Sequence, residues 1–385
     1  MRLRRKGLVV LFPLYYLAFY LCRYSLLPLI PLLVEDKILE ASQAGLIISA
    51  LYTGYAAMLI PASIFSRRYG AKKTVIVGAL GSVLSNFLLI FAQTFEAIFV
   101  LMFANGVFQG VVWPSLMYLV SAKYSGDDVD YTVGSMLTAA TFGPSAVFFL
   151  AGLIMMFFDS NAIFYIFGFV LLSLTIIFYN SVEETLAEKN MLDRNVLANR
   201  NIWLLAASYL CFYAIVKGAL SWLPVIITSE AKLSPAVASI VSSIFPIVSS
   251  LSAFTGTILS KKVSGKESIL LASFTLSALV LFLLNKQNIV LWLVVFFFAI
   301  SLSGWFFFTI PPAILPPESV ALASGIIDSM GYVGSSLGAT IVGFAGSIYG
   351  DYCAALKTLI TFCFAGIVFS TILVKWKHYR NNPAE

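Results

Sequence analysis

The sequence predicts an all-α membrane protein whose twelve transmembrane helices form two pseudo-symmetric six-helix bundles. The first observation is composition: the 385 residues are 60% hydrophobic and only 11% charged, whereas soluble domains carry about 25% charged residues. The second is a series of apolar runs, each long enough to cross a bilayer, which takes about 20 residues. The third is a set of glycines and tyrosines that recurs between the two halves of the chain.

The apolar runs, bounded by polar residues, define the expected helices. The basic N-terminus resembles the start of a signal peptide, but its apolar stretch runs well past 15 residues, so we interpret it as a retained first span. The polar interval 182–200 is predicted to be a cytoplasmic linker between an N-terminal bundle, 1–181, and a C-terminal bundle, 201–385. The twelve helices are expected near 8–33, 42–66, 74–93, 95–122, 131–158, 160–181, 201–228, 234–260, 267–285, 289–315, 319–348 and 350–375.

Basic residues predict the orientation of these helices. If both termini are cytoplasmic, eighteen of the 24 lysines and arginines lie in cytoplasmic segments, and only Lys37, Lys232 and Lys286 lie outside. Such a bias orients multi-pass proteins in the cell membrane. The net charge of +6 is therefore interpreted as a topology signal, and the expected partner is the lipid bilayer rather than nucleic acid.

The sequence offers little for enzyme chemistry. Its four cysteines have no paired spacing, and the single histidine, His378, lies in the polar C-terminal tail. Neither a histidine metal site nor a catalytic triad can be assembled from these residues. We therefore expect no metal, no cofactor and no catalytic residue, and an enzyme is the least favoured function.

The two halves repeat. Gly134, Gly143 and Gly152 in the fifth span match three glycines of the eleventh at a constant offset of 191, and Tyr16 and Tyr20 of the first span match Tyr209 and Tyr213 of the seventh at an offset of 193. Glycines alone could serve helix packing. Duplicated bundles are typical of secondary transporters, which bind their solute near the midplane between the halves.

Arg23 lies in the middle of the first span. Tyr16 and Tyr20 precede it at i−7 and i−3, on one helical face. An arginine at the bilayer centre costs roughly 2.5–3.5 kcal/mol on insertion scales, so such residues usually serve function. Arg23 is predicted to bind an anion, with the tyrosine hydroxyls beside it; the alternative is a structural arginine paired with a carboxylate or with helix carbonyls.

Lys217 is the corresponding cation of the seventh span. Tyr209, Tyr213 and Lys217 lie at i, i+4 and i+8, again on one face. One cation from each half would suit a doubly charged or bidentate anion, with Arg23 providing a planar fork and Lys217 a point charge. The alternative is that Lys217 is neutral or ion-paired.

Asp328 is the only carboxylate deep in a predicted span, and Tyr332 follows at i+4 on the same face. Three interpretations remain open: an ion pair with a cation, a proton-coupling carboxylate, or a structural polar contact. In the fourth span, Asn105, Gln109 and Trp113 also share a face. They could line the solute pathway or hold helices together.

The chain resembles the major facilitator superfamily, and within it the organophosphate:phosphate antiporter family. Tyr16-x-x-x-Tyr20-x-x-Arg23 is similar to that family's first-helix motif, whose arginine contacts the substrate phosphoryl group. The stretch NGVFQGVVWP from Asn105 resembles its fourth helix most specifically, Gly218-x-x-x-Trp222-x-Pro224 its seventh, and Gly331-Tyr332-x-Gly334 its eleventh.

The chain departs from the family pattern in three ways. The family's second phosphoryl arginine aligns with Val216, one place before Lys217. The second-helix lysine and fifth-helix histidine of the glycerol-phosphate type align with Leu59 and near Ala140. In the cytoplasmic superfamily motif, Arg67 replaces the usual aspartate.

The expected function is secondary transport of an anionic small solute (an organophosphate, phosphate or another organic anion) by alternating access and exchange. The chain is expected to act as a monomer, with phosphate as a possible counter-anion. One alternative is a proton-coupled symporter of a sugar acid or carboxylate, with Asp328 carrying the proton. A second is a transporter-like membrane sensor, because fold does not fix function.

Overall fold

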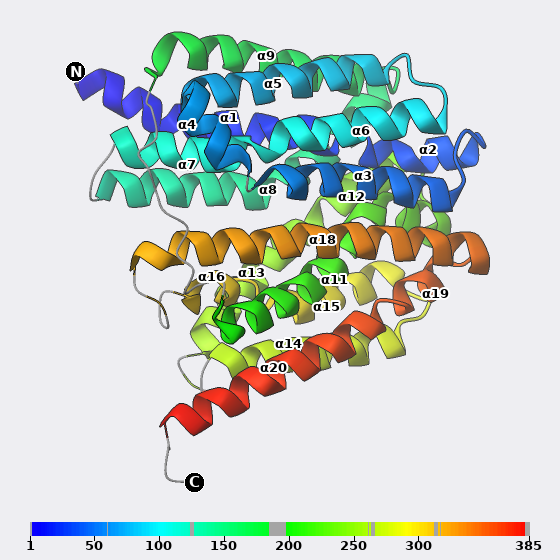
Figure 1. Ribbon diagram of the computed structural model, residues 1–385. Helices are drawn as coiled ribbons and strands as arrows, with labels where there is room; N and C mark the ends of the chain where they lie inside the picture. The colour runs from blue at the N-terminus through cyan, green and yellow to red at the C-terminus, as the bar shows by residue number, and fades with distance from the viewer. Residues whose placement is uncertain are drawn as a thin grey trace. The chain divides into compact units, whose positions relative to one another are not determined.

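The computed structural model describes residues 2–59, 61–123, 127–184, 198–260, 262, 266–311, 315 and 317–381. Within these residues the regular structure is entirely helical, without strands (Figure 1). The helices are α1 Arg2–Tyr24, η1 Leu27–Leu29, α2 Ile30–Glu35, α3 Ala41–Leu59, α4 Pro61–Tyr69, α5 Ala71–Leu89, α6 Phe95–Gly110, α7 Val112–Lys123, α8 Asp127–Phe157, α9 Ala162–Ser181, α11 Arg200–Ala231, α12 Pro235–Ser242, α13 Ile244–Leu259, α14 Lys266–Leu283, α15 Ile289–Ser301, α16 Phe306–Thr309, α18 Pro317–Tyr349, α19 Tyr352–Lys357 and α20 Ile360–Asn381.

The predicted twelve-helix fold is confirmed. Eight helical segments of the described chain are long and apolar enough to cross a membrane. Several predicted helices are interrupted within their length. The run at 95–122 is split into α6 and α7, the run at 234–260 into α12 and α13, and the run at 350–375 into α19 and α20.

Backbone contacts group the chain into two compact units. The first contains Met1–Asn190 and Leu233–Pro246, and the second contains Met191–Lys232 and Ile247–Glu385. The segment 233–246 groups with the first unit because α12 packs on α8, where the Ser239 hydroxyl donates a hydrogen bond of 2.7 Å to the Phe148 carbonyl. Most of the predicted linker, 182–200, lies outside the described residues.

The first span is a broken helix. It extends from Val9 to Glu35, but α1 ends at Tyr24, and the chain continues through η1 into α2. Proline has no N–H to donate to the carbonyl four residues earlier. Pro28 and Pro31 therefore remove two such bonds in adjacent turns, and the break falls near the middle of the span.

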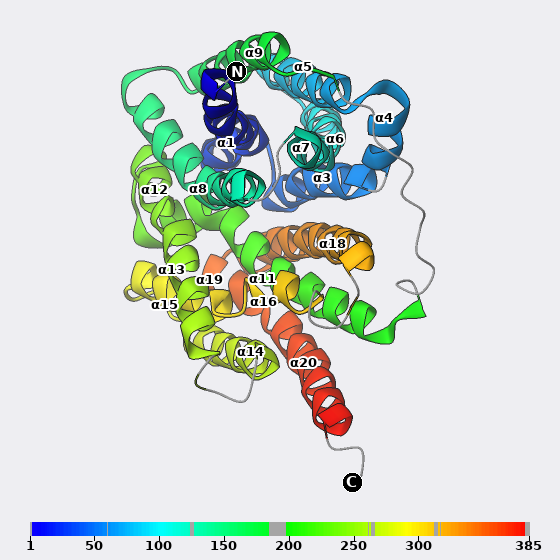
Figure 2. The ribbon, with the colours of Figure 1, turned by 90° about the vertical axis from the view of Figure 1, so that its left-hand side faces the viewer.

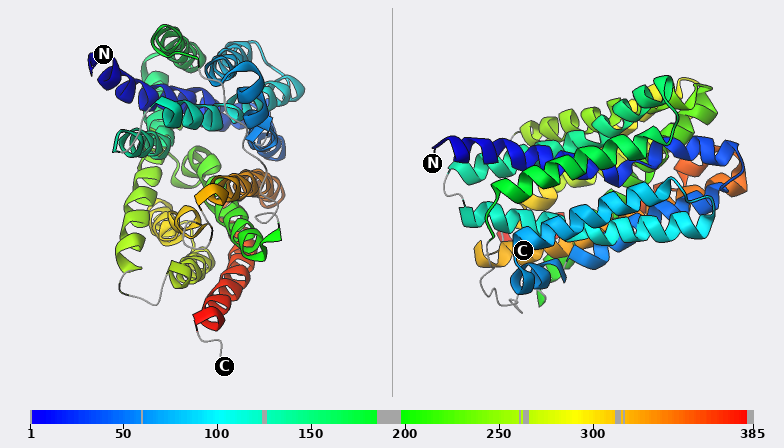
Figure 3. Two further views of the ribbon diagram at one scale, coloured as in Figure 1. Left: turned by 60° about the vertical axis from the view of Figure 1, so that its left-hand side comes forward. Right: turned by 90° about the horizontal axis from the view of Figure 1, so that it is seen from above.

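Glycines bring helices of the first unit close together. A Cβ atom at Gly106 of α6 would lie against the backbone of Leu51 and Tyr55 in α3, and one at Gly110 would meet Tyr55 again. The packing interpretation of these glycines is thus supported, as expected of small residues at membrane helix interfaces. The N-terminal α1 lies among the other helices of this unit (Figures 2 and 3).

The second unit is built around the pair α11 and α18. Gly334 and Gly338 of α18 approach the backbone of Leu210 and Ala214 in α11. The indole Nε1 of Trp222 donates a hydrogen bond of 3.0 Å to the Ala339 carbonyl, which ties the two helices further along. Gly334 and its repeat partner Gly143 each contact the first helix of their own unit: Gly334 meets Leu210 in α11, and Gly143 meets Tyr20 in α1.

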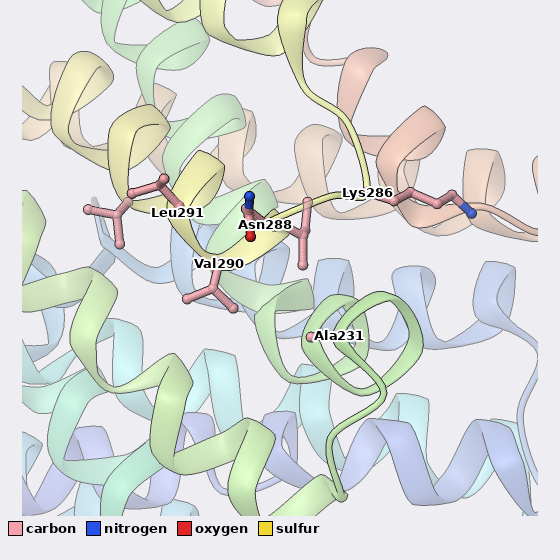
Figure 4. A pocket seen from close by; sticks show the side chains of 7 residues that line it. Ala231, Lys286, Asn288, Val290 and Leu291 are labelled. Carbon is pink, nitrogen blue, oxygen red and sulfur yellow. The ribbon is translucent and has the colours of Figure 1, made fainter.

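The C-terminal end of α11 is joined to two other helix ends by charge. The Lys286 ammonium lies 3.2 Å from a Glu230 carboxylate oxygen and 3.3 Å from one of Asp351. Glu230 also accepts a hydrogen bond of 2.9 Å from the Tyr352 backbone N–H. Lys286 borders an open hollow with Ala231 and Asn288 (Figure 4). This arrangement fixes the ends of α11 and α19 and the loop before α15.

A carboxylate from a distant segment caps α5. Gly70 occupies the N-cap position with φ +94 and has no side chain to accept the first N–H groups. Glu184, after α9, accepts hydrogen bonds from the backbone N–H of Lys72 at 2.9 Å and of Lys73 at 3.1 Å. A Cβ atom at position 70 would collide with this carboxylate. Glycine is therefore required here by both its backbone angle and the cap.

Candidate functional site

Arg23 lies in the last turn of α1, at the break of the first span. Its side chain is buried, with 1% exposure. Nε donates a hydrogen bond of 2.7 Å to Gln109 Oε1, and the guanidinium carbon lies 4.5 Å from the ring centroids of both Tyr20 and Tyr55. Cation–π contacts within about 6 Å are stabilising, more so when desolvated. The negative end of the α1 dipole also favours a cation here.

The predicted residues of the first unit lie together. The rings of Tyr16 and Tyr20 meet edge to face at 5.4 Å, and Tyr16 lies 5.0 Å from Trp113. With Gln109 and Arg23, all five thus form one continuous group. Trp113 follows the interruption between α6 and α7, so an irregularity in a second helix brings it to the same place.

A buried network of polar side chains supports Arg23 from behind. Gln109 Nε2 donates to Ser82 Oγ at 2.8 Å and to Asn105 Oδ1 at 3.0 Å, and Ser82 Oγ donates to Asn105 Oδ1 at 2.6 Å. Asn105 Nδ2 and Asn86 Nδ2 each donate to the Cys22 carbonyl at 3.0 Å. A carbonyl in the last turn of a helix has no helical partner, and here two amides provide one.

The hydrogen bond to Gln109 orients the Arg23 guanidinium but does not neutralise its positive charge. The amide of Gln109 is neutral, so its hydrogen bond fixes the guanidinium plane and leaves the positive charge in place. Arginine pairs with carboxylate and phosphate groups through parallel N–H bonds in that plane. Because Gln109 fixes the plane, it also fixes the direction in which such a pair would form.

The predicted residues of the second unit also lie together. Lys217 is half-buried in the middle of α11, and its Nζ lies 5.7 Å from the Tyr213 ring centroid. Tyr213 contacts Tyr209 at 4.3 Å and Tyr332 at 6.0 Å. Lysine and three tyrosines thus form a continuous row on α11 and α18.

Asp328 is half-buried on α18, one turn before Tyr332. This position places it on the helix that packs most extensively against α11. Its position alone does not distinguish an ion pair, a proton-coupling carboxylate and a structural polar contact, so these three roles remain predictions.

The only described group of side chains with metal-ligand spacing is Glu230, Asp351 and Cys353, whose ligand atoms lie within 4.8 Å of one another. Lys286 already places its ammonium against both carboxylates. An ammonium in that position repels a metal cation. The cluster is better described as a structural ion pair than as a metal centre.

Three residues near Arg23 were missed by the sequence reasoning: Tyr55, Ser82 and Asn86. Ser82 and Asn86 stand at i and i+4 in α5, a spacing that could have indicated a buried polar face. Tyr55 carries no comparable signal, because an aromatic residue in an apolar span is most often part of the core. In the second unit Phe307, 4.8 Å from Tyr209, was missed for the same reason.

Comparison with known protein families identifies the superfamily of the chain. The Major Facilitator Superfamily profile matches residues 14–338 and, in a second match, residues 205–385. The chain belongs to the major facilitator superfamily. A search of curated proteins gave no match.

Several solved structures have a similar fold over nearly the whole length of this superfamily member. A bacterial homologue of the human lysosomal transporter Spinster, inward-facing and occupied, has 14% identity and a TM-score of 0.75 over 96% of this chain and 95% of its own. The nucleoside transporter NupG, as a D323A mutant, has 16% identity and a TM-score of 0.77 over 95% and 98%. A D-xylose–proton symporter has 12% identity and a TM-score of 0.77 over 94% and 96%. At these identities the likeness shows the fold alone: a multi-pass membrane transporter fold.

Proposed function

We propose that this superfamily member carries an anionic small solute across the cell membrane by alternating access, as a monomer with both termini in the cytoplasm. Arg23 binds the acidic group of the solute, and Lys217 provides a second positive charge. The observation that carries the proposal is Arg23 itself: a buried guanidinium at the break of the first span, held by a neutral amide and two aromatic rings. Discontinuous helices at the midplane are where transporters of many folds bind their solutes.

The tyrosines and Trp113 complete the proposed site. Tyr16, Tyr20, Tyr209, Tyr213 and Tyr332 have hydroxyl groups that can donate to an oxyanion. Exchange is part of the proposal: closing the cavity around two positive charges is more costly without a bound anion than with one, so the empty carrier is expected to reorient slowly. An organophosphate, with phosphate as the counter-anion, is the solute that the first-helix motif favours; sugar acids and carboxylates have the same charge chemistry.

The proposal is tested by uptake into proteoliposomes. Radiolabelled phosphate, glycerol 3-phosphate and glucuronate are offered to vesicles preloaded with the same anions. We expect Arg23→Ala to abolish uptake while the protein remains monodisperse in detergent. Arg68→Ala removes the same charge from an exposed position on α4 and is the matched control. Normal uptake by Arg23→Ala would contradict the assignment.

The coupling mode is separated in the same vesicles. Exchange requires a loaded counter-anion and does not respond to an imposed pH gradient. Uptake into empty vesicles that is driven by an inward proton gradient, and lost in Asp328→Asn, would instead support the symporter. Anion binding without any flux would support the sensor.

A further inference from the structure

One backbone carbonyl sets the orientation of the amides behind Arg23. The Cys22 carbonyl can only accept hydrogen bonds, so Asn105 must present Nδ2 to it, at 3.0 Å. Asn105 Oδ1 then points the other way, where it accepts from Ser82 Oγ and from Gln109 Nε2. A flipped Asn105 amide would place an oxygen against the carbonyl and a nitrogen against Gln109 Nε2, and both contacts would be repulsive.

The same logic carries one step further, to the guanidinium. Because Gln109 Nε2 is directed to Asn105 and Ser82, its Oε1 faces Arg23 Nε, which can only donate. The chain of bonds therefore starts at the carbonyl of residue 22 and returns to the side chain of residue 23. These bonds form a closed circuit next to the break in the first span. The side chains of Arg23, Asn105 and Gln109 in this circuit are buried, with 1% exposure or less.

We propose that Asn105 is a positioning residue: it does not touch the solute, but through Gln109 it fixes the direction of the Arg23 guanidinium. The expected consequence, tighter binding of the solute's acidic group, rests on the proposed function. This inference also assigns the polar face of the fourth span a role that differs from lining the pathway or joining helices.

Asn86 provides a matched control within the same network. Its Nδ2 donates to the same Cys22 carbonyl at the same 3.0 Å, and it is equally buried. Its Oδ1, however, accepts from Ser25 Oγ, and its Nδ2 also donates to the Ser82 backbone carbonyl at 3.1 Å. Unlike Asn105, Asn86 makes no described hydrogen bond to Gln109. Loss of Asn86 therefore removes a comparable contact from the end of α1 but leaves the path through Gln109 intact.

The direct test observes the Arg23 Nε–H by NMR in the full chain, labelled with [15N]arginine and placed in lipid nanodiscs. Nine arginines contribute signals, and the Arg23 signal is assigned by its loss in Arg23→Lys. We expect slow solvent exchange of this hydrogen in the unmodified chain. Asn105→Ala should accelerate that exchange about tenfold, the scale of one buried hydrogen bond, and Asn86→Ala should change it less than twofold.

Two outcomes would overturn the positioning role: exchange in Asn105→Ala equal to that of the unmodified chain, or equal acceleration in Asn105→Ala and Asn86→Ala. Should the alanine variant not fold, Asn105→Leu, which is apolar and similar in size, gives the same comparison.

The second arm adds phosphate, glycerol 3-phosphate or glucuronate to the same samples. An anion that binds Arg23 shifts its Nε signal, with a Kd about tenfold higher in Asn105→Ala than in Asn86→Ala. If the exchange pattern holds but no anion shifts the signal, the proposed function fails while the positioning role stands. If anions shift the signal equally in both variants, the positioning role fails.

Discussion

The first helices of the two units begin alike and then diverge. Tyr16 and Tyr20 of α1 match Tyr209 and Tyr213 of α11 in sequence, yet α1 ends at Tyr24 and α11 continues unbroken to Ala231. The two cations differ accordingly. Arg23 is buried at a helix end inside a hydrogen-bonded circuit, and Lys217 is half-buried in mid-helix near the ring of Tyr213. Equivalent positions in a repeat can therefore hold their charges by different means.

The prolines explain this divergence. Pro28 and Pro31 follow Arg23 within eight residues, whereas α11 contains only Pro224, which lies inside the helix and is tolerated. Two prolines remove two hydrogen bonds in adjacent turns. Because α1 ends at Tyr24, the Cys22 carbonyl lies in its last turn. It accepts hydrogen bonds from the amides of Asn86 and Asn105, and Asn105 in turn accepts from Gln109, the partner of Arg23. Lys217, in contrast, lies within a helix that continues for fourteen residues beyond it, to Ala231.

The largest expected effect comes from replacing each of the two cationic residues by the other type, in Arg23→Lys and Lys217→Arg. Arg23→Lys loses the Nε bond to Gln109 and the planar contact with two rings, so uptake in proteoliposomes should fall by about 30- to 100-fold. Lys217→Arg keeps a cation beside Tyr213 and should retain uptake within about threefold. Equal losses in the two variants would show that uptake depends on the exact side chain at both positions, and not more strongly on Arg23.

A smaller effect is expected from charging the partner of Arg23. Gln109→Glu places a carboxylate at the position now 2.7 Å from Nε, which would neutralise the guanidinium and weaken anion binding by about tenfold or more. Gln109→Met removes the hydrogen bond without adding charge and should weaken binding less. Titration with glycerol 3-phosphate compares the two; stronger binding by the glutamate variant would argue against an anion at Arg23.

The end of α11 is tied by charge, in contrast to α1. Lys286→Ala leaves the carboxylate of Glu230, 6% exposed, without its ammonium, so the thermal unfolding temperature in detergent should fall while uptake is unchanged. Lys232→Ala, at the neighbouring α11 C-cap, is the control. A loss of uptake with no change in unfolding temperature would mean that Lys286 acts on the solute instead.

The pH dependence of this tie follows from its two pKa shifts. Hydrogen bonds to Glu230 and Asp351 raise the pKa of Lys286. Burial alone would raise the pKa of Asp351, but the Ala354 N–H and the Lys286 ammonium outweigh it and lower that pKa. The lysine contribution is present below its ordinary pKa of about 10.4 and the aspartate contribution above its ordinary value of about 3.9. The unfolding-temperature difference between the unmodified chain and Lys286→Ala should therefore stay constant between about pH 5 and 9 and shrink in stronger acid.

The smallest effect concerns the cap on α5 in the first unit. Glu184→Ala removes the acceptor for the Lys72 and Lys73 N–H groups, and loss of an N-cap costs about 1 kcal/mol. Glu183→Ala changes the adjacent carboxylate, for which no such bonds are found among the described residues, and should cost less. Denaturation of both variants in detergent gives the comparison, and equal stability would remove Glu184 as the cap.

The fold was largely predictable because bilayer length and apolar composition determine each span. The helix breaks were less so: Pro28 and Pro31 were visible in the sequence, but their effect depends on whether neighbouring helices satisfy the released carbonyls. The contact between Tyr20 and Arg23 followed from helical spacing. Tyr55 did not, because its approach to Arg23 depends on the close packing of α3 and α6 at Gly106. Long-range packing of this kind leaves little local signal in one sequence.

The central claim is that Arg23 recognises negative charge, and equilibrium binding tests it most directly. Binding of glycerol 3-phosphate and of neutral glycerol, and of glucuronate and its neutral methyl ester, is measured for the purified chain and for Arg23→Ala. We predict that at least one anion binds the unmodified chain, that its neutral counterpart does not, and that Arg23→Ala binds neither. Equal binding of a neutral counterpart, or undiminished anion binding by Arg23→Ala, would contradict the account.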